Sequence, residues 1–132
     1  MLGELIREAS GKLVGTRVLD EHGKIEATVE EHGRILGTEE TTTATFWAVP
    51  RSDGTLYGEV NRLTVTKDGE MATSKGSGIG RPKGRPPAAS YRAAVFYQTA
   101  SQKLARLNTV ISVAEVEIEE DGNFALKEWE WK

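Results

Sequence analysis

Six side chains of this sequence are either aromatic or charged, and all lie in segments where inward and outward positions alternate as in β-strands. Aromatic rings offer apolar contact, a guanidinium anchors a polar group, and a carboxyl group can transfer a proton. Such a set is typical of a small-molecule pocket. We therefore expect ligand-binding residues facing the interior at Trp47, Tyr57, Arg62, Tyr91, Arg92 and Glu128. The alternative is that these side chains only fill a core.

The two histidines suggest metal binding, because each follows a glutamate in Glu21-His22 and Glu31-His32. Each pair precedes a glycine that predicts a hairpin turn. Successive turns lie at opposite ends of a strand, roughly 25–30 Å apart at about 3.3 Å per residue. The two histidines therefore cannot share an ion, and we predict neither a metal site nor a cofactor.

Two further motifs invite a functional interpretation. The glycines of residues 76–80 have the spacing of a phosphate loop, but a proline-rich segment follows them where a helix should begin. Residues 82–86 are similar to an AT-hook, a basic element that lies in the DNA minor groove, with Lys83 where the stronger motif has arginine. One copy in an acidic chain favours a linker between strands, so we expect no nucleic-acid partner.

Composition limits the class of protein. The chain has 132 residues, 28% of them charged, a net charge of −3 and no cysteine. We expect one domain over residues 1–132, without disulfides, located in the cytoplasm. No apolar run approaches the roughly 20 residues that span a bilayer, so no membrane partner is predicted. No serine–histidine–aspartate arrangement is recognisable either, and the catalytic residues stay unassigned.

Glycine turns organise the strands that must position these residues. Five turns, each with a histidine or aspartate before glycine, are interpreted as three-residue hairpin loops. In that register every turn places two apolar residues opposite each other. The predicted pairs are Leu19 with Ile25, Val29 with Ile35, Pro50 with Leu56, Val65 with Met71, and Ile118 with Phe124.

The remaining chain completes eight strands joined mostly by tight turns, which predicts an all-β antiparallel meander. Closure of the first strand onto the last removes two exposed edges, so we predict a barrel. A capping box at Thr99 and Gln102 predicts a short helix near residues 100–107 that plugs one end. Residues 2–9 have helical spacing and are expected as one or two helical turns or as a docked tail. A change of phase predicts a bulge near Glu59–Arg62.

Three segments carry a resemblance to known proteins: residues 97–108, residues 54–59 and the end Glu128-Trp129-Glu130-Trp131-Lys132. Along most of its length the chain resembles a family of short uncharacterised prokaryotic proteins. That family in turn is similar to lipocalin-like and allene-oxide-cyclase-like β-barrels. The resemblance implies a barrel and carries over no catalytic residue.

Three functions fit these observations. The first is a barrel that binds a small apolar or amphipathic ligand, anchored by Arg62 or Arg92. The second is a cyclase- or isomerase-like enzyme in which an interior acid such as Glu128 acts with a tyrosine. The third is a solid-cored structural module that assembles into homo-oligomers. An enclosed void of about 300 Å³ or more would favour the first two.

Overall fold

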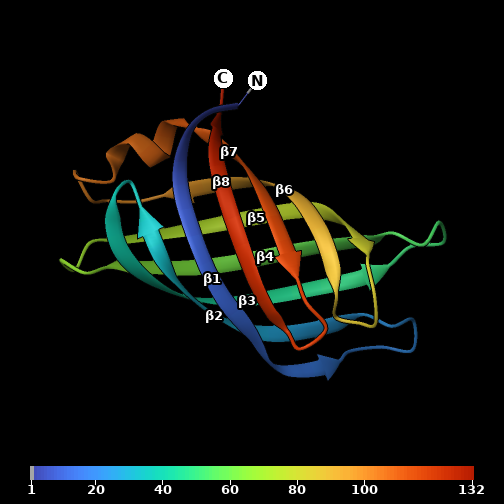
Figure 1. Ribbon diagram of the computed structural model, residues 1–132. Helices are drawn as coiled ribbons and strands as arrows, with labels where there is room; N and C mark the ends of the chain where they lie inside the picture. Colours follow the sequence, from blue (N-terminus) through green and yellow to red (C-terminus); the bar gives the residue numbers. More distant parts are fainter. Residues whose placement is uncertain (1) are drawn as a thin grey trace.

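In a computed structural model, which describes residues 2–132, the chain forms a closed barrel of eight strands in sequential order (Figure 1). Each strand is antiparallel to its neighbours, and β1 closes the barrel by pairing with β8. The predicted all-β meander barrel is therefore confirmed. The strands are β1 (Leu2–Val18), β2 (Ile25–Ile35), β3 (Thr38–Pro50), β4 (Leu56–Thr66), β5 (Met71–Pro82), β6 (Ala89–Gln98), β7 (Ile111–Ile118) and β8 (Asn123–Trp131).

The first strand is longer than expected, and the helical turns or docked tail predicted for residues 2–9 are wrong. This segment belongs to β1 and is paired on both sides, with Arg7 opposite Ile35 of β2 and Glu128 of β8. The ladder with β8 shifts register on either side of Leu5. Ile6 and Arg7 are consequently both buried although they are adjacent. Because of that irregularity, the apolar residues at the start of β1 have a spacing that is typical of a helix.

The three Asp-Gly turns have the predicted register. Pro50 pairs with Leu56, Val65 with Met71, and Ile118 with Phe124. The glycine of each turn has a φ near +88°, a conformation in which other residues are strained.

The two His-Gly turns were predicted wrongly. At the first, Val18 rather than Leu19 pairs with Ile25, so the loop is one residue longer. At the second, Gly33 lies inside β2 and the chain reverses later, at Leu36 and Gly37. A Cβ on Gly33 would lie 2.1 Å from the backbone oxygen of Glu8. Glycine is needed there because β1 passes close to β2, and not because the chain turns.

The predicted bulge near Glu59–Arg62 is also wrong, because β4 pairs in unbroken register with both β3 and β5. Leu63, which suggested the change of phase, is 40% exposed on the outer face. Arg62 and Thr64 therefore keep the inward positions of a regular strand.

The short helix expected near residues 100–107 is present as a five-residue 3₁₀ helix, η1 (Ala105–Thr109). The predicted capping box does not form, because the Thr99 hydroxyl accepts from the Ser101 backbone N–H at 3.0 Å and not from that of Gln102. The same hydroxyl donates to the Met71 backbone oxygen at 2.6 Å. Leu104 and Leu107 are buried and close one end of the barrel as predicted. Figure 1 shows η1 at the end where β1 begins and β8 finishes.

Two apolar clusters divide the interior. The capped cluster comprises Ile6, Ile35, Ala72, Val95, Tyr97, Leu104, Leu107 and Ala114. The second, here called the cavity cluster, comprises Ala9, Val29, Ala44, Ala89, Tyr91, Ile118, Phe124 and Leu126. Charged side chains are buried with them, which is costly unless each is paired.

Candidate functional site

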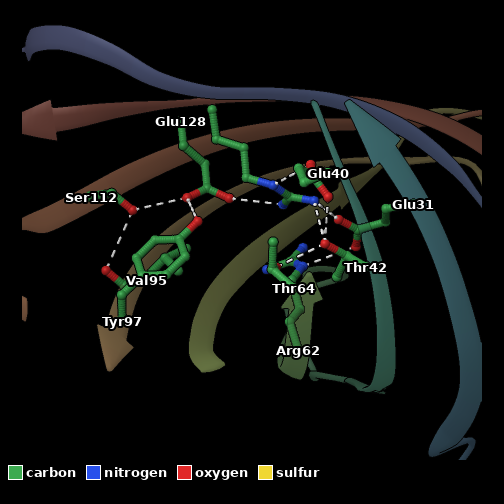
Figure 2. Close-up of polar contacts among 10 residues, drawn as sticks. Glu31, Glu40, Thr42, Arg62, Thr64, Val95, Tyr97, Ser112 and Glu128 are labelled. Carbon is green, nitrogen blue, oxygen red and sulfur yellow. Dashed lines mark hydrogen bonds and ion pairs between the residues drawn. The ribbon is translucent and has the colours of Figure 1, made fainter. Parts of the chain in front are cut away.

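Arg7 is the centre of a buried network that joins β1, β2, β3 and β8. Its Nε donates to Glu40 Oε2 at 3.0 Å, and its Nη1 donates to Glu128 Oε2 at 3.3 Å. Its Nη2 donates to Glu31 Oε1 at 2.6 Å and to Thr42 Oγ1 at 3.1 Å. The side chains of Arg7 and all three glutamates are 0% exposed. Figure 2 shows the carboxylates of Glu31, Glu40 and Glu128 converging from different strands.

Strand register explains why these residues meet. Arg7 is opposite Glu128 in the closing ladder, and Glu31 is opposite Thr42 between β2 and β3. Glu40 precedes Thr42 by two positions and so shares its inward face. The same regular alternation that buries alanine and valine thus brings acidic side chains to the guanidinium of Arg7.

The charges of the network support one another. Burial alone would lower the pKa of Arg7, but the negative charges of Glu31, Glu128 and Glu40 outweigh it and hold the pKa well above its usual value. Burial would likewise raise the pKa of Glu31, whereas the charges of Arg62 and Arg7 outweigh it and lower that pKa. Arg7 is therefore a cation and Glu31 a carboxylate at neutral pH.

Glu128 has a second set of partners on β6 and β7. The Tyr97 hydroxyl donates to Glu128 Oε1 at 2.6 Å, and the Ser112 hydroxyl donates to the same oxygen at 3.1 Å (Figure 2). Burial, and then the charge of Glu128, raise the pKa of Tyr97 well above its usual value. Tyr97 is thus a protonated donor, and this contact ties β6 to β8 across the interior.

Arg62 is the second interior guanidinium, and it is only partly used. Its Nε donates to Glu31 Oε2 at 2.9 Å. Its side chain is 8% exposed. Neither terminal nitrogen hydrogen-bonds to any residue within 2–132, whereas every guanidinium nitrogen of Arg7 has a partner. Arg62 therefore keeps N–H donors available.

A cavity of about 60 Å³ lies beside Arg62 and Glu31. Since a water molecule has a share of about 30 Å³ in the liquid, this is space for roughly two waters or a small organic group. The rest of the wall is mainly apolar and comes mostly from the cavity cluster and its neighbours, with Val95 and Ala114 from the capped cluster. It includes Val29, Phe46, Val60, Tyr91, Val116 and Phe124.

Missing side chains on β4 and β5 give Tyr91 its position in this wall. A Cβ on Gly80 would lie 2.5 Å from the Tyr91 ring, and one on Gly58 would lie 3.2 Å from it. The ring meets Phe46 edge-on with centroids 5.6 Å apart. Burial raises the pKa of Tyr91 to about 12, and its hydroxyl forms no hydrogen bond with any residue from 2 to 132. Tyr91 is therefore a neutral phenol with a donor to spare.

Of the six residues selected from sequence, the structure brings Arg62 and Tyr91 together at the cavity. Glu128 also points inward, but it belongs to the Arg7 network and does not line the cavity.

The interior positions predicted for Trp47, Tyr57 and Arg92 are wrong, because unbroken alternation places all three on the outer face. The ring centroids of Trp47 and Tyr57 are 5.7 Å apart, and Lys24 Nζ lies 4.3 Å above the Trp47 ring. The Arg92 side chain is 58% exposed beside Glu117.

Sequence reasoning missed Arg7, Glu31 and Glu40. A signal was available for Glu31, because it continues the inward series of Ala27 and Val29 once β2 is extended past the supposed turn. Arg7 had no such signal, since the register shifts beside it break the alternation.

The other predicted motifs lie outside this site. Lys83 Nζ donates to Glu117 and Glu119, both at 2.9 Å, so the AT-hook-like loop is tied to the β7–β8 region. His22 lies in the first turn and His32 is exposed on β2. Within residues 2–132, no three His, Asp or Glu side chains are arranged to hold a metal ion. In the same range, no helix is long and apolar enough to cross a membrane.

No protein-family model matches the sequence, and no curated protein matches it. Solved structures do resemble it. A protein with unknown function from Clostridium acetobutylicum is 13% identical with a TM-score of 0.85, over 98% of both chains. A beta-barrel like protein from Acinetobacter baumannii is 14% identical with a TM-score of 0.80, over 100% of this chain and 96% of that one. An enzyme from Penicillium herquei is 19% identical with a TM-score of 0.64, over 98% of this chain and 96% of that one. At such identities the likeness establishes the barrel fold alone.

Proposed function

We propose that this protein binds a small amphipathic molecule inside the barrel, as lipocalin-like barrels do. The apolar part of the ligand contacts Phe46, Tyr91 and Val116, and its polar part accepts hydrogen bonds from Arg62. The observation that carries the proposal is a guanidinium with free donors at the wall of an apolar cavity.

The free donors of Arg62 are accessible and not sealed inside the protein, because within residues 2–132 Ser74 Oγ is the one fully buried side-chain polar atom without a partner. A ligand or water can therefore reach them. Arg7 shows that this fold can give every nitrogen of a buried guanidinium a side-chain partner. The open edge of Arg62 is therefore the feature that a ligand would complete.

The volume of the cavity restricts the ligand. Pockets for drug-sized molecules usually enclose about 300–1,000 Å³. The cavity here is about 60 Å³, so the expectation of a void of about 300 Å³ is not met. The proposed ligand consequently has only a few non-hydrogen atoms. A solid-cored module, the competing interpretation, would retain no such molecule.

The enzyme alternative has less support from the geometry. Its proposed acid, Glu128, does contact a tyrosine, Tyr97. Both are enclosed in the Arg7 network and neither lines the cavity. The likeness to one enzyme extends to the fold only. We therefore interpret the contact between Glu128 and Tyr97 as structural, linking β8 to β6.

The proposal can be tested by native mass spectrometry of the purified protein, followed by NMR titration with small amphipathic compounds. We expect binding to survive Arg92→Met, a matched change at an exposed arginine, and to be lost in Arg62→Met. Ala93→Leu, which fills the cavity and keeps Arg62, should also abolish binding. A compound that binds all variants equally, or a screen in which nothing binds, would refute the proposal.

A further inference from the structure

An apolar face covers the outside of four consecutive strands, β6, β7, β8 and β1, near the capped end of the barrel (Figure 1). Ten large apolar side chains are exposed within residues 2–132. Five of them lie on this face and are between 41% and 56% exposed: Leu2, Leu5, Phe96, Ile111 and Trp131. Folded monomers rarely gather exposed apolar side chains into one large patch. The clustering therefore indicates a surface that another molecule covers.

Cross-strand pairing arranges the face in rows that run across the four strands. The row nearest the end of the barrel holds, in strand order, Phe96, Ile111, Trp131 and Leu2. The second row holds, in the same order, Ala94, Val113, Trp129 and Leu5. A groove lies over Ala94 and Val113, the two smaller members of this second row. Half of the face is thus recessed and the other half carries larger side chains.

A row of alternating charges borders the apolar face on the side away from the capped end. In strand order it consists of Arg92, Glu115, Lys127 and Glu8, each opposite its neighbour in the sheet. Arg92 lies 3.9 Å from Glu115, and Lys127 lies 3.8 Å from Glu8. Arg92 also lies 3.4 Å from Glu117, the next outward residue along β7. All four side chains of the row are about half exposed, so they are accessible to a partner.

The order of these charges matches a second copy of the same chain. A two-fold axis that runs parallel to the strands, between β7 and β8, makes β7 of one copy face β8 of the other. Glu115 then faces Lys127 of the second copy, and Arg92 faces its Glu8. Every contact along the row joins opposite charges. A two-fold axis perpendicular to the strands would instead place the row against apolar side chains or against like charges.

The apolar rows are complementary in the same arrangement. Val113 faces Trp129 of the second copy, and Ala94 faces its Leu5. Each pair in the second row therefore joins a small side chain to a larger one, and the larger one enters the groove. Because the outside of a barrel is convex, β7 and β8 at the centre of the face make the closest contacts.

We propose that the outer face of β6, β7, β8 and β1 is the interface of a symmetric dimer of this chain. The proposal is independent of the ligand inside the barrel. The three rows hold twelve side chains per copy, fewer than the roughly 20–30 residues a side of a standard interface. We therefore expect a reversible dimer with a Kd of about 1–100 µM.

Charge reversal tests this interface at exposed positions, and sedimentation velocity of the whole protein from about 1 to 500 µM measures it. We expect the wild type to change from monomer to dimer over that range. Glu115→Lys and Lys127→Glu each place like charges opposite each other at two symmetric positions, so each should weaken dimerisation roughly 10-fold or more. An equal mixture of the two variants should dimerise as the wild type does, because each supplies the charge that the other lacks.

Two further variants complete the test. Trp131→Ala removes apolar contact without changing the charge and should weaken dimerisation roughly 10-fold or more. Lys67→Glu, a matched reversal at a lysine that is 76% exposed in the β4–β5 turn, should leave it unchanged.

Several results would overturn the proposal. A wild type that stays monomeric at the highest concentration has no such dimer. Dimerisation that both single reversals leave unchanged uses a different face, and a mixture that stays monomeric excludes the contact between Glu115 and Lys127 of the second copy. Binding of monomeric wild type to vesicles of anionic phospholipid, lost in Trp131→Ala, would assign the face to a membrane surface instead.

Discussion

The two ends of the barrel are filled in different ways. At the capped end, Leu104 and Leu107 enter from a segment outside the sheet and are at most 3% exposed. The residues that line the cavity come from the strands, and β5 contributes Gly76 and Gly78, which have no side chain. The number of strands fixes the width of a closed barrel. Space can therefore remain at the end that receives no side chains from a segment outside the sheet.

The interior arginines show the same difference. The Arg7 side chain is 0% exposed, and each nitrogen of its guanidinium has a side-chain partner. Arg62 borders the cavity and pairs with Glu31 alone. The first arginine holds strands together, and the second retains free donors for a ligand.

Removal of Arg7 should be the most damaging change. Arg7→Met leaves buried carboxylates without their shared cation, and we expect the free energy of unfolding to fall by about 3–5 kcal/mol. Urea denaturation followed by tryptophan fluorescence would measure it. Arg17→Met, at an arginine 63% exposed and paired with Glu26, should cost less than about 1 kcal/mol. Equal losses in the two variants would mean that the network contributes no more than a surface ion pair.

Replacing an alanine with valine should destabilise the protein to different extents at the two ends of the barrel. Ala72, in the capped cluster, is 2% exposed, so Ala72→Val overpacks a filled region and should cost about 1–3 kcal/mol. Ala93 lines the cavity, where Ala93→Val has room, and the loss should stay below about 1 kcal/mol. Thermal unfolding of both variants measures the difference. The reverse order would show that the cavity end is the more tightly packed.

The smallest expected effect is the pH dependence that comes from Glu31. Its pKa is lowered in the folded protein, because Arg62 and Arg7 outweigh burial. Its stabilising contribution is therefore complete above the unfolded pKa, about 4.3, and is lost as pH falls through the lower folded value. Urea unfolding between pH 3 and 7 should show a shallower acid decline in Glu31→Gln than in the wild type. Parallel curves would contradict this assignment.

The sequence predicts the barrel well because Asp-Gly turns are strong local signals. Pro50–Leu56, Val65–Met71 and Ile118–Phe124 follow from turn geometry and apolar pairing alone. Gly33 has the same appearance in sequence, but it is glycine because another backbone approaches it. Local reasoning cannot distinguish these two roles, since the second depends on a strand far away in the chain.

The site is less predictable for a related reason. A false turn at Gly33 ended the predicted strand at Glu30 and hid Glu31, and a false bulge near Arg62 obscured which residues face inward. Tyr91 and Arg62 were identified because apolar or alternating neighbours surround them. Arg7 depends on partners such as Glu128, 121 positions later, which no local pattern reveals.

The pairing of β1 with β8 has a consequence for the order of events during synthesis. Until β8 has left the ribosome, β1 and β7 each expose an unpaired backbone edge that can join a neighbouring chain. The same delay deprives Arg7 of Glu128, so the network and the last ladder are completed together. A nascent chain of this protein is therefore most prone to aggregate just before its final strand emerges.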